Sequence, residues 1–243
     1  MTQLLLETAT DVCSVAIAQA GEILAEHTSA DPFQHASHLT LFIRQVAEQA
    51  GINLQQLQEV VLSDGPGSYT SLRVGAATAK GLCLALPGLQ LRVVPTLSAL
   101  ALATGHTGLV LPTINSRRGQ VYGQLYDLGA LPQVPGDGES DRSAGYWVNP
   151  QNIILTEETW LEDLLEVVGG AAITVTGPGQ QRVQEMLPTG APVQFLAPDT
   201  CRATFLLAPA AAPAYSRIVD SATYEPAYLN PPFVTKSKKK PLG

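Results

Sequence analysis

The alternation of apolar and polar positions predicts a mixed α/β fold. Three short apolar segments, separated by polar or glycine turns, open the chain and predict an antiparallel meander of strands. Two later segments carry apolar residues every three or four positions, which is the spacing of one helix face. For the first half this gives strands at 4–6, 13–18, 23–27, 59–63 and 91–94, and helices at 34–50, 72–86 and 96–104.

The second half repeats strands and helices in shorter form. We expect strands at 109–111, 121–128, 153–155, 173–176 and 193–196, and helices at 156–168, 180–187 and 200–212. Residues 129–149 are rich in Gly, Pro, Asp and Ser, which predicts a long hairpin tip or insertion with little fixed structure. The alternation of strands and helices indicates a mixed sheet in each half with helical crossovers.

The turn after the strand at 59–63 organises the first half. It reads Asp-Gly-Pro-Gly-Ser from Asp64 to Ser68 and leads straight into a helix. Ser68 or Thr70 is suited to cap that helix, whose first N–H groups then point at whatever lies above the turn. Such a turn suits a bound phosphate or other anion, and it equally suits an ordinary tight connection. The candidate anion-binding residues are Gly65, Pro66, Gly67, Ser68 and Thr70.

Composition and net charge argue against several classes of function. The chain has 243 residues and a formal net charge of −7, which argues against a nucleic-acid-binding protein that works by bulk positive charge. Its three cysteines show no metal-binding spacing and are expected to be buried thiols in a reducing cytosol. We expect neither a signal peptide nor a membrane span, because no apolar run is long enough.

Several polar groups are candidates for chemistry, each with a plainer alternative. His35 and His38 lie three residues apart and could share a metal, or could simply pack on their helix face. Glu7 and Asp11 flank the first turn and could hold Mg²⁺ through water, or could be solvated. The pair that begins at Arg117 could bind an anion or start a solvated strand.

Four segments together resemble the TsaB (formerly YeaZ) family. They are residues 4–16, the glycine turn and helix start at 65–75, residues 115–122, and the late pair Tyr228 and Leu229. The resemblance covers most of the chain in the right order, and its glycine-proline-glycine-serine segment is the most specific part. The chain departs from the family at Asn115, where an aspartate is usual, and the histidine pair has a different spacing from the metal motif of the related TsaD.

The resemblance implies a two-lobed α/β fold like that of actin, sugar kinases and Hsp70 (the ASKHA or ribonuclease H-like architecture), with a smaller second lobe. We expect lobes at 1–104 and 105–243, a helix at about 200–216 that packs back on the first lobe, and a disordered tail at 234–243.

The implied function is that of a cytoplasmic, non-catalytic subunit in the synthesis of N6-threonylcarbamoyladenosine at position 37 of tRNAs that read codons beginning with adenine. The implied partners are TsaD and the ATPase TsaE, with a homodimer in their absence and only indirect contact with tRNA. The resemblance implies no cofactor of the chain's own, since ATP and metal belong to those partners.

The first two long helices are the expected partner-binding face. The small residues of the second helix would allow close approach of another helix. The residues expected at this interface are His35, His38, Leu39, Phe42, Arg73, Ala76, Ala79, Lys80 and Cys83.

Two other functions stay open on the sequence. One is an active ASKHA-type phosphotransferase or metal-dependent hydrolase. The other is direct recruitment of tRNA by the lysine-rich segment at 236–240.

Overall fold

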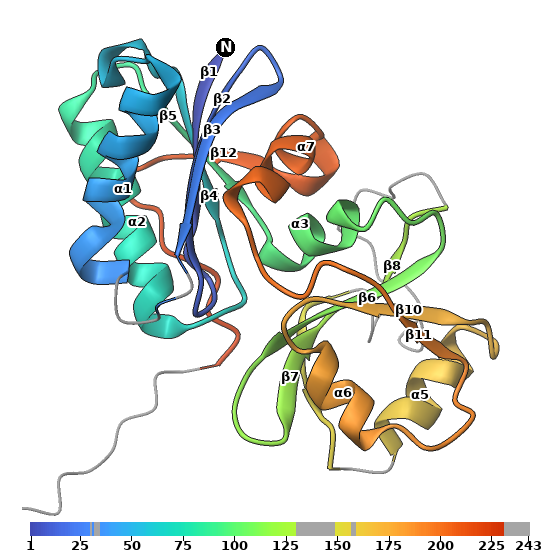
Figure 1. Cartoon of the computed structure of the whole chain (residues 1–243). Coiled ribbons are helices and arrows are strands. Elements are labelled where there is room, and N and C mark those ends of the chain that lie inside the picture. The colour runs from blue at the N-terminus through green and yellow to red at the C-terminus, as the bar shows by residue number, and fades with distance from the viewer. Residues whose placement is uncertain (30, 32–34, 130–148, 157–158, 231–243) are drawn as a thin grey trace, which may run out of the picture.

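The protein consists of two α/β lobes with one helix between them (Figure 1). The computed structural model describes residues 1–29, 31, 35–129, 149–156 and 159–230, and of residues 35–37 only the backbone. The insertion predicted at 129–149 (apart from its two end residues), the predicted tail at 234–243 and the lysine-rich segment lie outside the described residues.

The first lobe contains a six-stranded mixed sheet in the order β12-β5-β4-β1-β2-β3. Strands β1, β2 and β3 form the expected antiparallel meander, while β1, β4 and β5 run parallel to one another. The bounds of these strands are Thr2–Glu7 (β1), Cys13–Gln19 (β2), Glu22–Ser29 (β3), Glu59–Ser63 (β4), Gln90–Val94 (β5) and Arg217–Val219 (β12). This two-lobed, mixed-sheet arrangement confirms the predicted fold class.

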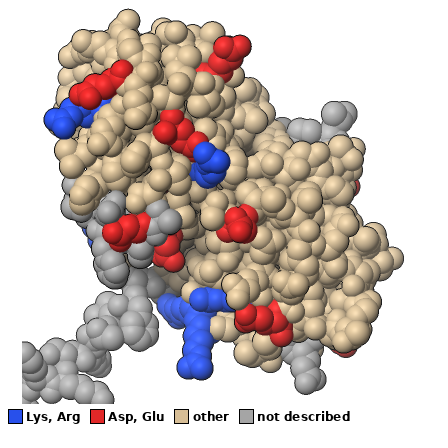
Figure 2. Space-filling view, viewed as in Figure 1, with Lys and Arg blue, Asp and Glu red and all other residues tan. Residues whose placement is uncertain are grey.

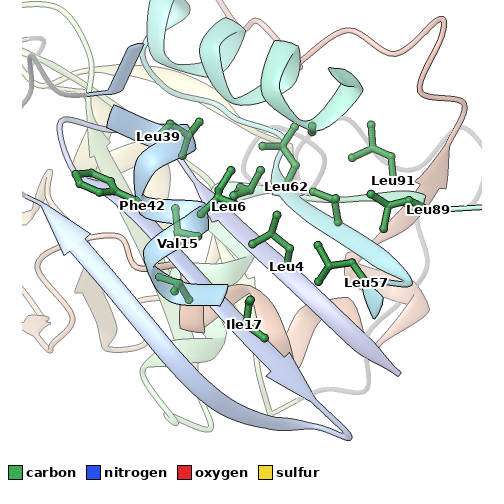
Figure 3. Close-up of a cluster of buried hydrophobic side chains, with 14 of the residues drawn as sticks. Leu4, Leu6, Val15, Ile17, Leu39, Phe42, Leu57, Leu62, Leu89 and Leu91 are labelled. Atoms are coloured by element: carbon green, nitrogen blue, oxygen red, sulfur yellow. The ribbon is translucent and has the colours of Figure 1, made fainter. Parts of the chain in front are cut away.

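Helices cover both faces of the first sheet, so its central strands are apolar on both sides. Helices α1 (His35–Ala50) and α2 (Tyr69–Ala85) pack on one face (Figures 1 and 3). Leu4 and Leu6 of β1 point into that core, and Leu5 points to the opposite face. There it meets the segment formed by η2 (Ala203–Leu206) and α7 (Leu207–Ala210). This continuous burial explains why β1 and β4 have almost no polar alternation.

The second lobe is built on a smaller mixed sheet in the order β11-β10-β6-β7-β9, with β8 paired to β6. A separate hydrophobic core of buried residues lies under its two helices. Its elements are β6 (Leu109–Asn115), β7 (Gln120–Gly123), β8 (Tyr126–Asp127), β9 (Gln151–Ile154), α5 (Thr159–Val167), β10 (Ile173–Thr176), α6 (Gln180–Met186) and β11 (Val193–Phe195).

Helix α3 (Thr96–Ala103) joins the lobes (Figure 1). Its side chains Leu97 and Leu100 pack with Ile114 and Tyr122 of the second lobe. Thr96 is the first helical residue, and its hydroxyl accepts a hydrogen bond from the Gly65 N–H at 3.2 Å. The helix is therefore tied to the glycine turn rather than capped by its own threonine.

Most helices and strands lie where the local sequence pattern predicted them. A few differ from the prediction because of packing between distant segments. Asn53 and Gln56 form a capping box, a local sequence signal, around the short helix η1 (Leu54–Gln56). The strand expected at 121–128 is broken into β7 and β8, and the helix expected at 200–212 is reduced to the turns of η2 and α7. Pro209 lacks the N–H that a longer helix would need.

The chain returns to the first lobe after the second one is complete. Strand β12, which was not predicted, pairs antiparallel with β5, and the η2–α7 segment lies against the first sheet before it. The predicted lobes divide at 104/105, whereas the first sheet draws its last strand from residues 217–219. A short helix η3 (Pro213–Tyr215) precedes that strand.

Asp64 fastens this returning segment to the glycine turn. Its carboxylate is 4% exposed and accepts hydrogen bonds from the Tyr224 hydroxyl at 2.8 Å and from Arg217 Nη2 at 2.6 Å. Its backbone carbonyl accepts from the Ala227 N–H at 2.9 Å. The Lys80 ammonium donates to the Tyr224 carbonyl at 3.0 Å. We call residues 217–230 the C-terminal strap.

Replacing Tyr224 by Phe removes one hydrogen bond to a buried charged acceptor. We expect a loss of about 1.5–3 kcal/mol in the free energy of unfolding, measured by urea titration, because hydrogen bonds to charged groups contribute that much. Tyr215→Phe, on the preceding half-buried turn, is the matched control and should change stability by less than about 0.5 kcal/mol. Equal losses for the two variants would contradict the role given to Asp64.

Candidate functional site

A pocket of about 420 Å³ lies between the two lobes. Four segments that are distant in sequence form its walls: the first hairpin turn, the start of α2, the second lobe's turns and the end of the C-terminal strap. The lining residues are Ala9, Thr10, Asp11, Val12, Gly67, Ser68, Tyr69, Ile114, Asn115, Ser116, Arg117, Tyr122, Pro178, Arg182, Thr200, Tyr228, Leu229 and Asn230.

The first-lobe wall joins the glycine turn to the first hairpin turn at very close range. The Ser68 N–H donates to the Ala9 carbonyl at 2.7 Å. A Cβ placed on Gly67 would lie only 2.2 Å from that same oxygen, so any side chain here would force the two turns apart. Glycine at position 67 is therefore required by this contact.

The five candidate anion-binding residues do not all line the pocket. Gly67 and Ser68 line the pocket, and Ser68 caps α2 by accepting from the Ser71 N–H at 3.4 Å. Gly65 and Pro66 are buried, Gly65 against the Ala227 carbonyl of the strap, and Thr70 is exposed and does not line the pocket. An anion at this turn stays a prediction, and it now concerns Ser68 and the helix start alone.

The second-lobe wall is held by side chains bonded to backbone carbonyls. Asn115 Nδ2 donates to the Pro178 carbonyl at 2.9 Å, which ties the end of β6 to the turn formed by Gly177, Pro178 and Gly179, a second glycine-proline-glycine segment. Arg182 Nη1 donates to the carbonyls of Ser116, Arg117 and Gln120 at 3.4, 2.8 and 3.0 Å. The guanidinium thus braces the β6–β7 hairpin turn. In Figure 2 the largest group of Lys and Arg side chains lies beside the junction of the lobes, where Figure 1 shows this hairpin.

The end of the strap forms the remaining wall. The ring of Tyr228 lies 4.6 Å from that of Tyr69, centroid to centroid, and Asn230 Nδ2 donates to the Tyr122 hydroxyl at 3.1 Å. The strap therefore contacts both lobes. Sequence reasoning did not connect Tyr122 with Asn230, because no local pattern relates residues 108 positions apart.

Glu7 and Asp11 do not share a site. Glu7 is 1% exposed, and burial raises the pKa of its carboxyl to about 7, although hydrogen bonds from Ala9 and Ser63 act in the opposite direction. Asp11 is exposed and lines the pocket. Across the described ranges, no three side chains of the His, Cys, Asp or Glu type gather in a metal-binding arrangement.

Four of the expected interface residues are in the interior of the first lobe. Leu39, Phe42, Ala76 and Ala79 are at most 6% exposed and belong to the core between α1, α2 and the sheet. The prediction that they offer a surface to a partner is wrong for this conformation. Small residues at Gly75 and Ala76 instead let α2 approach the sheet: a Cβ on Gly75 would lie 2.3 Å from Thr8 Oγ1.

The other expected interface residues differ in exposure. Arg73 is exposed and stacks over the Tyr69 ring at 5.4 Å. Lys80 and Cys83 are half-buried against the strap, and half-buried His38 lies 5.9 Å from the Phe42 ring. His35 has no described side chain, so its predicted role lies outside what the structure describes.

The outward side of α2 carries a different set of small and apolar residues. Ala77, Gly81 and Leu84 are exposed, Leu84 to 87%, and Leu41 of the neighbouring α1 is 40% exposed. The sequence indicated that α2 carries small residues, but not which side of the helix the sheet would cover. We call Arg73, Ala77, Gly81 and Leu84 the outer face of α2.

The buried carboxyl of Glu7 predicts a pH-dependent stability. Its folded-state pKa of about 7 lies above the ordinary value of 4.5, so the folded state binds the proton more tightly. Stability should therefore decrease between about pH 4.5 and pH 7 and level off above, by up to about 3 kcal/mol. Glu7→Gln should remove this decrease in urea titrations at pH 5 and 8.

The matched control for that titration is Glu22→Gln, which changes an exposed carboxylate at the start of β3. It should keep the pH dependence of the unaltered protein. Parallel pH profiles for Glu7→Gln and the unaltered protein would contradict the assignment.

Comparison with known proteins identifies the family. Residues 22–133 match the family model described as TsaD, tRNA N6-adenosine threonylcarbamoyltransferase. The chain is 31% identical over 169 residues to the tRNA threonylcarbamoyladenosine biosynthesis protein TsaB of Bacillus subtilis, an alignment that covers 68% of this chain and 67% of that protein. It is 30% identical over 128 residues to the Escherichia coli protein of the same name, of which it covers 55%.

Solved structures agree on the fold. YeaZ from Pseudomonas aeruginosa superposes with a TM-score of 0.69 over 94% of this chain and all of that one, at 23% sequence identity. An uncharacterised Pseudomonas aeruginosa protein with similarity to peptidase YeaZ gives the same TM-score at 24% identity. From the two-lobed fold and the sequence relationship together, the chain belongs to the TsaB (YeaZ) family.

Proposed function

We propose that this chain serves the formation of N6-threonylcarbamoyladenosine in tRNA as a non-catalytic subunit that supports a TsaD partner. The observation that carries this proposal is the relationship to the Bacillus subtilis protein, which is named for that biosynthesis. TsaE is the third component of the proposed assembly, ATP and metal belong to these partners, and the setting is the cytoplasm. None of the helices that the structure describes has both the length and the apolar character needed to cross a membrane.

A supporting subunit needs a surface that a partner can cover. The outer face of α2 fits this requirement, because Ala77 and Gly81 leave room for another helix and Leu84 presents an apolar side chain. Complete burial of an exposed leucine contributes about 1.5–3 kcal/mol, enough to matter in an interface of modest size. The proposed occupant is the TsaD partner, or a second copy of this chain when TsaD is absent.

In this proposal the inward side of α2 packs within the first lobe, and the outward side contacts the partner. The inward side packs against the sheet through its small residues Gly75, Ala76 and Ala79. The outward side starts at Arg73, which lies over Tyr69 beside the pocket, and ends at Leu84. A partner on this side would lie next to the strap, since Lys80 of the same helix holds the Tyr224 carbonyl.

Reconstitution tests the function directly. Threonylcarbamoyl transfer to tRNA is measured with purified TsaD and TsaE homologues from the same source, with and without this chain. We expect modified tRNA only when all three are present. Full transfer without the chain would overturn the supporting role, and transfer by the chain alone would show that it is itself catalytic.

Substitution at Leu84 tests the proposed interface. Leu84→Glu should weaken association with TsaD by about tenfold or more, because it places a charge in an apolar contact. Met186→Glu is the matched control: Met186 is 45% exposed in the last turn of α6, on the other lobe, and receives the same charge. Association is measured by analytical ultracentrifugation. Equal affinities for both variants would exclude the outer face of α2.

A further inference from the structure

The end of the C-terminal strap lies against the first turn of α2. The ring centroids of Tyr228 and Tyr69 are 4.6 Å apart. Arg73 Nη1 donates a hydrogen bond to the Tyr69 hydroxyl at 3.3 Å, and its guanidinium lies over the same ring. Burial and Tyr69 raise the pKa of the Tyr228 hydroxyl, and the Arg73 charge acts in the opposite direction, so the three groups lie within electrostatic range of one another. The strap is therefore joined to the outer face of α2.

This group of side chains is partly open to solvent. Arg73 is exposed, Leu229 is 37% exposed, and Tyr69 and Tyr228 are half-buried. Aromatic residues and Arg are enriched at protein interfaces, and an apolar side chain beside them gains free energy when a partner covers it. We call Tyr69, Arg73, Tyr228 and Leu229 the strap–α2 cluster. Its composition and exposure fit a protein-binding surface.

The guanidinium of Arg73 has no carboxylate partner in the part of the chain that the structure describes. Among those residues it forms no ion pair, and its one side-chain hydrogen bond is the bond to Tyr69. A guanidinium carries five N–H donors, and its planar fork matches a carboxylate. Because Tyr69 holds the side chain, less conformational freedom would be lost when a partner binds it. Arg73 is thus positioned to pair with an acidic side chain.

The composition of α2 indicates what kind of partner fits. Its 17 residues include neither Asp nor Glu. A second copy of the chain that packed its α2 against this one could not offer Arg73 a carboxylate from that helix. A different protein with an acidic side chain at this position could, and the ion pair would also fix how the two proteins are aligned. Because the cluster continues the outer face of α2, the different protein is the one proposed to cover that face, TsaD.

We propose that the strap–α2 cluster is a second contact region for the TsaD partner, where an Asp or Glu side chain of TsaD pairs with Arg73 and apolar side chains cover Leu229. This inference rests on the proposed function and extends it, since the contact region would continue from Leu84 along α2 onto the strap. Asn230, the next residue, donates to the Tyr122 hydroxyl at 3.1 Å. A partner on the cluster would therefore contact a segment that also touches the second lobe.

Association of the full chain with a purified TsaD homologue, measured by analytical ultracentrifugation, tests this region. Arg73→Gln should weaken association by about tenfold, because it removes a charge-assisted hydrogen-bonded pair. Arg118→Gln removes the same charge from an exposed residue of the β6–β7 hairpin and should change affinity by less than about twofold. Leu229→Ala should weaken association by about threefold or more. Its matched control is Leu196→Ala, because Leu196 is 39% exposed on the second lobe and should have no effect.

Tyr69 is a positioning residue in this proposal, because it acts on the partner through Arg73. Tyr69→Leu should weaken association several-fold, and Tyr69→Phe, which keeps the ring under the guanidinium, should retain most of the affinity. In the Arg73→Gln background, Tyr69→Leu should have little further effect. A purely structural role of Tyr69 would give the same loss in both backgrounds. Circular dichroism confirms that each variant is folded before association is measured.

Three results would overturn the proposal. Equal weakening by Arg73→Gln and Arg118→Gln would indicate diffuse attraction to positive charge. Unchanged affinity of Arg73→Gln and Leu229→Ala, while Leu84→Glu still weakens association, would exclude the cluster and leave the proposed function in place. If Arg73→Gln weakened self-association of the chain as much as association with TsaD, the cluster would belong to a contact between two copies. Failure of the unaltered chain to associate with TsaD would overturn the proposed function as well.

Discussion

The buried carboxylate of Asp64 connects parts of this protein that lie far apart in sequence. It stands at the end of a central strand, directly before the glycine turn, and accepts a hydrogen bond from Tyr224, 160 residues later. A charged group with so little exposure is tolerated only when it is fully hydrogen-bonded, so the strap and the carboxylate depend on each other. The exposed Arg217 adds an ion pair that solvent weakens. Through this contact the C-terminal strap is brought to the turn before α2.

The glycine turn needs glycine because a neighbouring backbone carbonyl lies very close to it. Gly67 leaves space for the Ala9 carbonyl, and Gly177 of the second lobe leaves space for the Thr113 carbonyl in the same manner. Each glycine-proline-glycine turn therefore brings a neighbouring backbone within a distance that no side chain permits. Gly67 and Pro178 of these turns both line the interlobe pocket. The two turns thus lie at two rims of one pocket, one on each lobe.

One side of helix α2 packs in the hydrophobic core, and the other side is exposed at the surface. Its small residues are distributed around the helix, and those at Gly75, Ala76 and Ala79 allow close packing on the sheet. On the other side of the helix, Leu84 is exposed to solvent. The same helix begins at the pocket and holds the strap through Lys80, so one helix joins the pocket wall to the strap. This arrangement suits a subunit whose task is to present a surface.

The sequence by itself determined the order and type of most elements, because hydrophobic period, glycine turns and the Asn53 capping box are local signals. It also determined the family, through the specific segment that follows Asp64. Only the tertiary structure decided that β12 joins the first sheet and that Ala76 and Ala79 face inward. It alone brought Tyr122 and Asn230 together at the pocket. The physical reason is that burial and pairing between distant segments depend on which surfaces meet, and a local pattern records only that a residue is small or apolar.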